Sequence, residues 1–127
     1  MLPAALDWLL QTAAGHHIEA RIYSRRESLH APHLTLEIAQ VLRRLVRERA
    51  LTPQRADEAI EDMLSLPITR YAHDVFLSKI WSYRHNLSAY DATYVTLAER
   101  LGAVLLTRDH KLASACSALA GVKVEVL

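Results

Sequence analysis

The pattern that most constrains the fold lies between Ser88 and the C-terminus, where helical and extended segments alternate. Ser88 is a good helix N-cap, and the helical segment that it begins ends at Gly102. The short apolar run 103–106 follows at once, as a buried parallel strand does. A second helix is expected over residues 110–120, and residues 122–126 alternate valine with charged side chains like an edge strand. A helix between two strands predicts a parallel α/β sheet.

The earlier part of the chain predicts more helix than strand. Short extended segments are expected at residues 28–31 and 68–71. Thr35, Asp74 and the Thr52-Pro53 pair are predicted to begin helices. Apolar residues at helical spacing predict helices near residues 6–15, 18–22, 38–45, 53–64 and 74–84. Because helices are in excess, the strands of the sheet must be few and short.

Composition excludes several classes of protein. The 127 residues fit a single domain spanning residues 1–127, and 51% hydrophobic residues suffice for a core. The sequence contains no apolar run long enough for a membrane span and no signal-peptide pattern, so a cytoplasmic protein is expected. Cys116 is the only cysteine, which excludes an internal disulfide and a cysteine-based zinc site. Its small-residue surroundings predict a buried filler.

Three acidic residues lie at the expected strand exits and helix starts. Asp109 follows the run 103–106 closely, Asp91 lies in the first turn of a helix, and so does Glu37. Sites in open parallel sheets form beyond the carboxyl ends of the strands. Carboxylates gathered there would repel one another unless a cation neutralised them, and oxygen ligands favour Mg²⁺, with Mn²⁺ as an alternative. Each acid also has a simpler interpretation as a helix-capping or first-turn charge.

Three longer segments resemble one known family. Residues 30–44 (HAPHLTLEIAQVLRR) are similar to the second acidic motif of PIN-domain ribonucleases of the VapC toxin family. Residues 84–99 (RHNLSAYDATYVTLAE) resemble the third motif, and residues 105–113 (LLTRDHKLA) resemble the fourth. Order and spacing agree from about residue 9 to the C-terminus, so the resemblance covers most of the chain.

The resemblance implies a three-layer α/β/α domain with a short parallel sheet. It makes Glu37, Asp91 and Asp109 the catalytic metal-site carboxylates, with Thr107 supporting the turn at Asp109 through its hydroxyl. Proteins of the family are Mg²⁺-dependent, cleave RNA and usually form homodimers. A small cognate antitoxin of the VapB type holds them inactive and places a basic side chain near the acidic site.

The N-terminus departs from the family pattern. The family begins with a strand and an aspartate, and the alignment of the first helix places that aspartate at Met1. Pro3 stands where serine or threonine is usual, and Asp7 lies too far into the helix to replace the missing acid. The fold is therefore expected to lack the first, central strand of the family. Either the flanking strands 28–31 and 103–106 pair directly, or another segment fills the slot, or the native protein starts upstream, which is the outcome we favour.

Two functions from different classes follow. The leading hypothesis is a Mg²⁺-dependent endoribonuclease toxin of a type II toxin-antitoxin system, impaired by the loss of the first aspartate. The alternative is a catalytically inactive relic that binds an antitoxin or RNA. A nucleotide-binding domain is disfavoured because the chain has only three glycines and no glycine-rich phosphate loop.

The excess of apolar helix over sheet also predicts self-association. Helices that a small sheet cannot cover need another surface to bury their apolar faces, and a second copy of the chain supplies one. Light scattering at micromolar concentration should therefore give about twice the mass of one chain. A monomeric mass at that concentration contradicts this prediction.

Overall fold

The computed structural model of the chain describes residues 10, 16, 19–20, 29–31, 34–119 and 121–127. The predicted helices near residues 6–15 and 18–22, the first strand and Met1, Pro3 and Asp7 lie wholly or largely outside these residues. None of the described helices has the length and apolarity needed to cross a bilayer. In chain order the elements are β1 (Leu29–Ala31), α3 (Leu34–Arg47), α4 (Pro53–Ser65), β2 (Ile68–Arg70), the 3₁₀ turn η1 (Asp74–Phe76), α5 (Leu77–Ser82), α6 (Ala89–Leu101), β3 (Leu105–Thr107), α7 (His110–Leu119) and β4 (Val124–Val126).

Three predicted helix boundaries are confirmed. The Thr52 side chain accepts a hydrogen bond from the Arg55 amide at 3.2 Å, directly before Pro53 opens α4. The Ser88 hydroxyl accepts one from the Asp91 amide at 3.1 Å at the start of α6. Gly102 ends α6 with a φ of 59°, the left-handed conformation in which a glycine meets no Cβ penalty.

Two predicted caps are wrong. Asp74 lies inside η1, which follows His73 without a side-chain cap. Thr35 is already within α3, and its hydroxyl instead accepts a hydrogen bond from Arg70 Nε at 3.2 Å. Arg70 Nη2 also donates to the Met63 carbonyl at 3.4 Å, so one side chain connects β2 to the start of α3 and to α4. Long-range contacts of this kind override a local capping signal.

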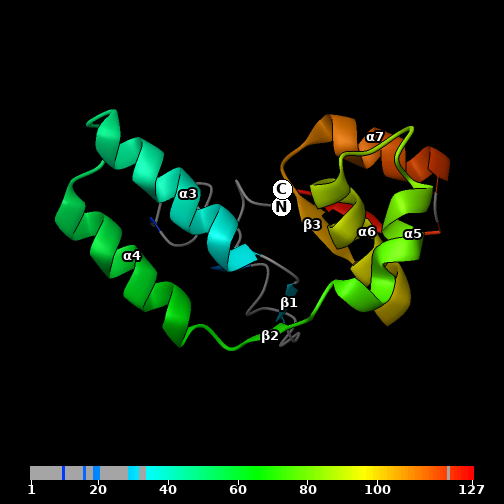
Figure 1. The fold of residues 1–127 in the computed structure, drawn as a ribbon, viewed down its shortest axis with the longest axis horizontal. Coiled ribbons are helices and arrows are strands. Elements are labelled where there is room, and N and C mark those ends of the chain that lie inside the picture. The colour runs from blue at the N-terminus through cyan, green and yellow to red at the C-terminus, as the bar shows by residue number, and fades with distance from the viewer. Residues whose placement is uncertain (1–9, 11–15, 17–18, 21–28, 32–33, 120) are drawn as a thin grey trace.

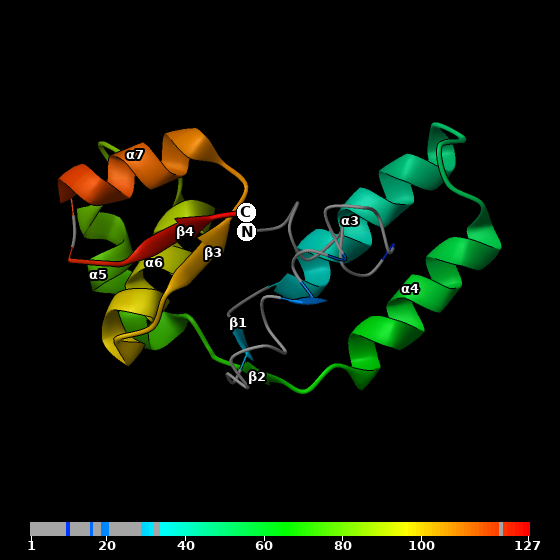
Figure 2. The same ribbon diagram turned by 180° about the vertical axis from the view of Figure 1, so that it is seen from behind.

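One half of the molecule is the α3–α4 hairpin (Figure 1). Ile38 and Leu42 lie one turn apart on α3 and are almost completely buried, as the apolar spacing predicts. They face α4, where Ala59 and Met63 are equally buried. The strands β1 and β2 lie near the lower end of this hairpin, and β2 leads the chain from α4 into the second half (Figure 2).

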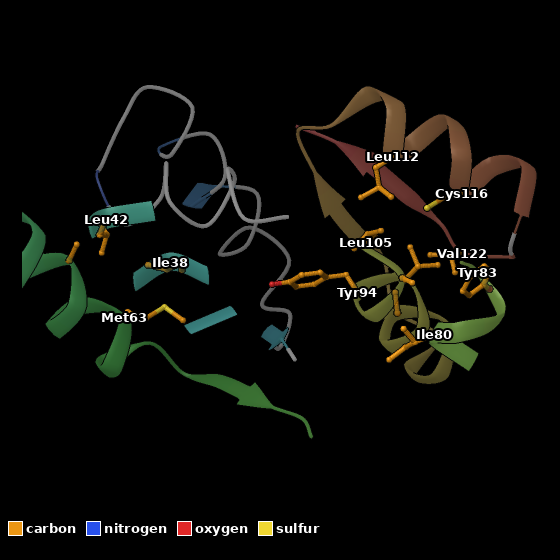
Figure 3. Packing of buried hydrophobic residues seen from close by; sticks show 14 residues of the cluster. Ile38, Leu42, Met63, Ile80, Tyr83, Tyr94, Leu105, Leu112, Cys116 and Val122 are labelled. Atoms are coloured by element: carbon orange, nitrogen blue, oxygen red, sulfur yellow. The ribbon is translucent and has the colours of Figure 1, made fainter. Parts of the chain in front are cut away.

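The other half is built around α6. Every residue of this helix from Ala92 to Ala98 is buried. Helix α5 packs on it through Ile80, and so does Tyr83, which directly follows α5. Tyr83 donates its hydroxyl to Glu99 Oε2 at 3.2 Å. The β3–β4 pair packs against both α6 and α7 (Figure 3), and the three-layer α/β/α arrangement stays a prediction.

The strands are parallel, as predicted, but the described strands do not form one sheet. Strand β1 pairs with β2, with Leu29 opposite Ile68, and β3 pairs with β4, with Leu105 opposite Val124. These are separate two-stranded sheets. Within the described chain, β1 and β3 therefore do not pair with each other. The alternative in which these two flanking strands pair directly in place of the first strand is therefore wrong. Whether the family's first strand is missing stays a prediction, because that part of the chain lies outside the described residues.

Gly102 gives a stability prediction with an internal control. Gly102→Ala should lower the free energy of unfolding by about 1 kcal/mol, because a side chain is strained at positive φ even where space is open. Gly121→Ala meets nothing within 4 Å and has no such φ, so it should not destabilise the protein. Urea unfolding of both variants checks this. Equal stability of the two variants contradicts the role given to Gly102.

Candidate functional site

Glu37 lies in the first turn of α3, where its negative charge is favourable for the helix. The helix start is held to β2 by the bond between Arg70 and Thr35, two residues before Glu37. The Glu37 side chain is half-buried, and its Oε1 accepts a hydrogen bond from the Tyr94 hydroxyl at 3.4 Å. This bond joins residues 57 positions apart and reaches from α6 to α3.

Asp91 lies in the first turn of α6, fixed there by the Ser88 cap. Its carboxylate is half-buried. Its negative charge contributes to raising the pKa of both Tyr94 and Cys116, so it lies near the Tyr94 hydroxyl and near the α7 thiol. Asp91 therefore faces the interior of its half of the molecule rather than bulk solvent alone.

Tyr94 is the residue on which the two acids converge. Its side chain is 5% exposed and extends from α6 towards the α3 half (Figure 3). Burial is the largest cause that raises the pKa of Tyr94 far above its usual value, followed by the charge and hydrogen bond of Glu37 and then the charge of Asp91. The hydroxyl therefore keeps its proton and acts as a hydrogen-bond donor to Glu37.

Asp109 is fixed by a different, local set of bonds. Its amide donates to the Thr107 hydroxyl at 3.0 Å, and Thr107 is fully buried in β3. Its Oδ1 accepts from the amides of Lys111 at 2.9 Å and Leu112 at 3.1 Å, which is the geometry of an N-cap of α7. The side chain itself is exposed. The simpler interpretation, a helix cap, therefore describes what Asp109 does in this structure.

The donor chemistry fits a divalent cation, but the full predicted set does not come together. Carboxylate oxygens are the ligands that Mg²⁺ prefers. Glu37 and Asp91 both act on Tyr94, whereas Asp109 is engaged at the start of α7. No group of three His, Cys, Asp or Glu side chains that could hold a metal occurs among the residues that the structure describes.

Tyr94 is the part of the site that sequence reasoning missed. Of the aromatic residues Trp81, Tyr90 and Tyr94, only Tyr94 is buried, and it contacts a candidate site residue. The signal was its position three residues after Asp91, which places both on one face of a helix. The partner on α3 could not be inferred from this spacing. Cys116 is buried as predicted, and burial, followed by the charge of Asp91, raises the pKa of its thiol.

Comparison with known proteins identifies close relatives. The PIN domain family matches residues 4–117 of the chain. Ribonuclease VapC3 of Mycobacterium tuberculosis is 43% identical over 91 residues, which are 71% of this chain and 66% of that protein, just under two thirds of its length. Ribonuclease VapC9 of the same organism is 43% identical over 95 residues, covering 74% of this chain and 75% of that protein. Ribonuclease VapC12 is 32% identical over 111 residues, covering 87% and 84%.

The capping geometry of Asp109 leads to a prediction about stability. Asp109→Ala should lower the free energy of unfolding by about 1 kcal/mol, because two amides of α7 lose their acceptor. Asp109→Asn should stay within a few tenths of a kcal/mol of the parent, because asparagine caps equally well. Chemical unfolding of both variants measures the difference. If alanine is as stable as asparagine at this position, the cap contributes nothing.

Proposed function

We propose that the chain is a Mg²⁺-dependent endoribonuclease, because it belongs to the PIN-domain family and, within it, to the VapC ribonuclease toxins. It acts in the cytoplasm as the toxin of a type II toxin-antitoxin pair. The relatives are named ribonucleases. The match to the PIN domain family over residues 4–117 includes all three acidic segments described above.

The observation that carries the proposal is the convergence of Glu37 and Asp91 on Tyr94. The two acids come from different halves of the molecule and from elements far apart in sequence. Two carboxylates held near one partly enclosed point repel each other, and a cation relieves that repulsion. A purely structural helix charge needs no such partner from across the molecule.

Each acid has a proposed role. Asp91 and Glu37 hold the metal, and Asp109 is the third carboxylate of the set while it also caps α7. The two roles of Asp109 are compatible because Oδ1 takes both backbone bonds and a carboxylate has two oxygens. Mg²⁺ held by these carboxylates would supply charge neutralisation at the scissile phosphate and an oriented water. Thr107 fixes the backbone at Asp109.

RNA and protein partners fit the surfaces around these acids. Arg43, Arg44 and Arg47 are exposed on α3, the helix that also carries Glu37, and offer charge-assisted contacts to phosphates. An antitoxin of the VapB type would inhibit by presenting a basic side chain to the acidic pair. For the homodimer, Leu77 and Trp81 lie four residues apart on α5 and are 60% and 65% exposed, which makes this helix face a candidate contact.

A second function, a catalytically inactive relic that binds an antitoxin or RNA, is favoured by one observation. The three acids do not form a metal-ready cluster within the described residues. A relic would keep the dimer and antitoxin surfaces and bind its antitoxin tightly, but it would take up no Mg²⁺. Metal-dependent turnover by the purified chain eliminates this alternative.

The proposal predicts the effect of one isosteric change. Asp91→Asn keeps the shape of the side chain and removes its charge, so Mg²⁺-dependent cleavage of total cellular RNA should fall by about 100-fold or more. The matched control is Asp57→Asn, on the exposed surface of α4, which should cleave like the parent. Cleavage products are followed by gel electrophoresis with millimolar Mg²⁺ and with EDTA. Unchanged cleavage by Asp91→Asn sinks the proposed mechanism.

A further inference from the structure

We propose that Tyr94 is a positioning residue that holds the Glu37 carboxylate beside Asp91. This inference rests on the proposed function, because it assigns a purpose to Tyr94 only if Glu37 and Asp91 serve a common cation. Tyr94 is neutral, so its proposed role is to orient an acidic ligand and not to bind the metal through a charge.

The first support is the place of Tyr94 between the two halves of the molecule. Its backbone belongs to α6, one turn after Asp91, and its hydroxyl reaches Glu37 on α3. Figure 3 shows the ring between the α3–α4 core residues and those around α6. A rigid ring with two side-chain torsions is therefore the connection between one acid's helix and the other acid's carboxylate.

The second support is the mobility of a glutamate without such a partner. Glu37 has three side-chain torsions, and fixing a long side chain costs conformational entropy. A donor that is itself buried in a core has already lost its freedom, so the bond orients the carboxylate with little further cost. Asp91, with a shorter side chain in the first turn of α6, needs less help of this kind.

The third support is a contrast with Tyr83, the other buried tyrosine that donates to a carboxylate. The Tyr83 partner, Glu99, is also paired with Lys79 at 3.8 Å, and the Lys79 ammonium lies 5.0 Å from the Tyr83 ring centroid. That cluster is charge-balanced and joins α5 to α6. Tyr94 donates to Glu37, and a second acid, Asp91, contributes to raising the pKa of Tyr94. The Tyr83 cluster includes a cation of its own, Lys79, whereas the two acids that act on Tyr94 supply the oxygen ligands that Mg²⁺ prefers.

The test is Mg²⁺ binding, measured by titration calorimetry on the parent chain and its variants. Tyr94→Phe keeps the ring and removes the hydroxyl, and it should weaken Mg²⁺ binding by about tenfold, the scale of one hydrogen bond to a charged group. Glu37→Gln should also weaken binding. In the Glu37→Gln background, Tyr94→Phe should then cause no further loss, because the hydroxyl acts only through Glu37.

Tyr83→Phe is the matched control. It removes the same hydroxyl from a tyrosine that is equally buried and also bonded to a glutamate. Tyr83→Phe should lower the melting temperature without changing Mg²⁺ affinity. If Tyr94 had only a structural role, Tyr94→Phe would give the same result. A second variant, Glu37→Asp, keeps the charge but withdraws the carboxylate from Tyr94, and it should weaken binding about as much as Tyr94→Phe does, so the test survives a failure of Tyr94→Phe to fold.

The outcomes separate this inference from the proposed function. If Glu37→Gln weakens Mg²⁺ binding while Tyr94→Phe and Glu37→Asp bind like the parent, Tyr94 positions nothing and the proposed function stands. If the parent chain binds no Mg²⁺, or binds it as well after Glu37→Gln, the metal role of Glu37 is wrong and both ideas fall. A loss in Tyr94→Phe that persists at full size in the Glu37→Gln background also overturns the positioning role.

Discussion

The burial of α6 is the constraint on which the described structure depends. A helix enclosed from Ala92 to Ala98 needs neighbours on all sides, and α5 and β3 pack against it. Its start is fixed by Ser88 and its end by Gly102, so its register is defined at both termini. The positions of Asp91 and Tyr94 are therefore well defined, because both residues lie on this helix. The packing of the core thus determines where these two residues of the candidate site lie.

Local signals predicted what local physics decides. The caps at Thr52 and Ser88 and the left-handed glycine at 102 depend on residues close in sequence, and each is found. The predicted parallel pairing is found as well, although its partners lie further apart along the chain. Thr35 and Asp74 carried equally good local signals, but Thr35 bonds to Arg70 and Asp74 sits within a 3₁₀ turn. A side chain with two eligible partners takes the one that the tertiary structure brings near, and a single sequence does not show which that is.

The sequence predicted which way the strands run, but not that they form two separate sheets. Parallel pairing within β3–β4 follows from the helix between the two strands. The Leu105 amide donates to the Lys123 carbonyl, and the Thr107 carbonyl accepts from the Leu127 amide. Because residues alternate in direction along a strand, the amide and carbonyl of Leu106 point away from β4. The described part of β3 thus has one paired edge, and separation from β1 is a property of long-range packing that no local pattern encodes.

The three candidate acids differ in what holds them, and this difference explains how far sequence reasoning could reach. Asp109 is fixed by hydrogen bonds to residues two or three positions away, and the sequence of this turn is sufficient to predict them. Asp91 is fixed by its place in the first turn of α6, which the sequence also predicts. Glu37 accepts a hydrogen bond from Tyr94, a donor that the fold brings from 57 positions away in the sequence. Long-range orientation is thus the least predictable part of the site, and it is also the part most sensitive to changes in the packing of α3 against the rest of the chain.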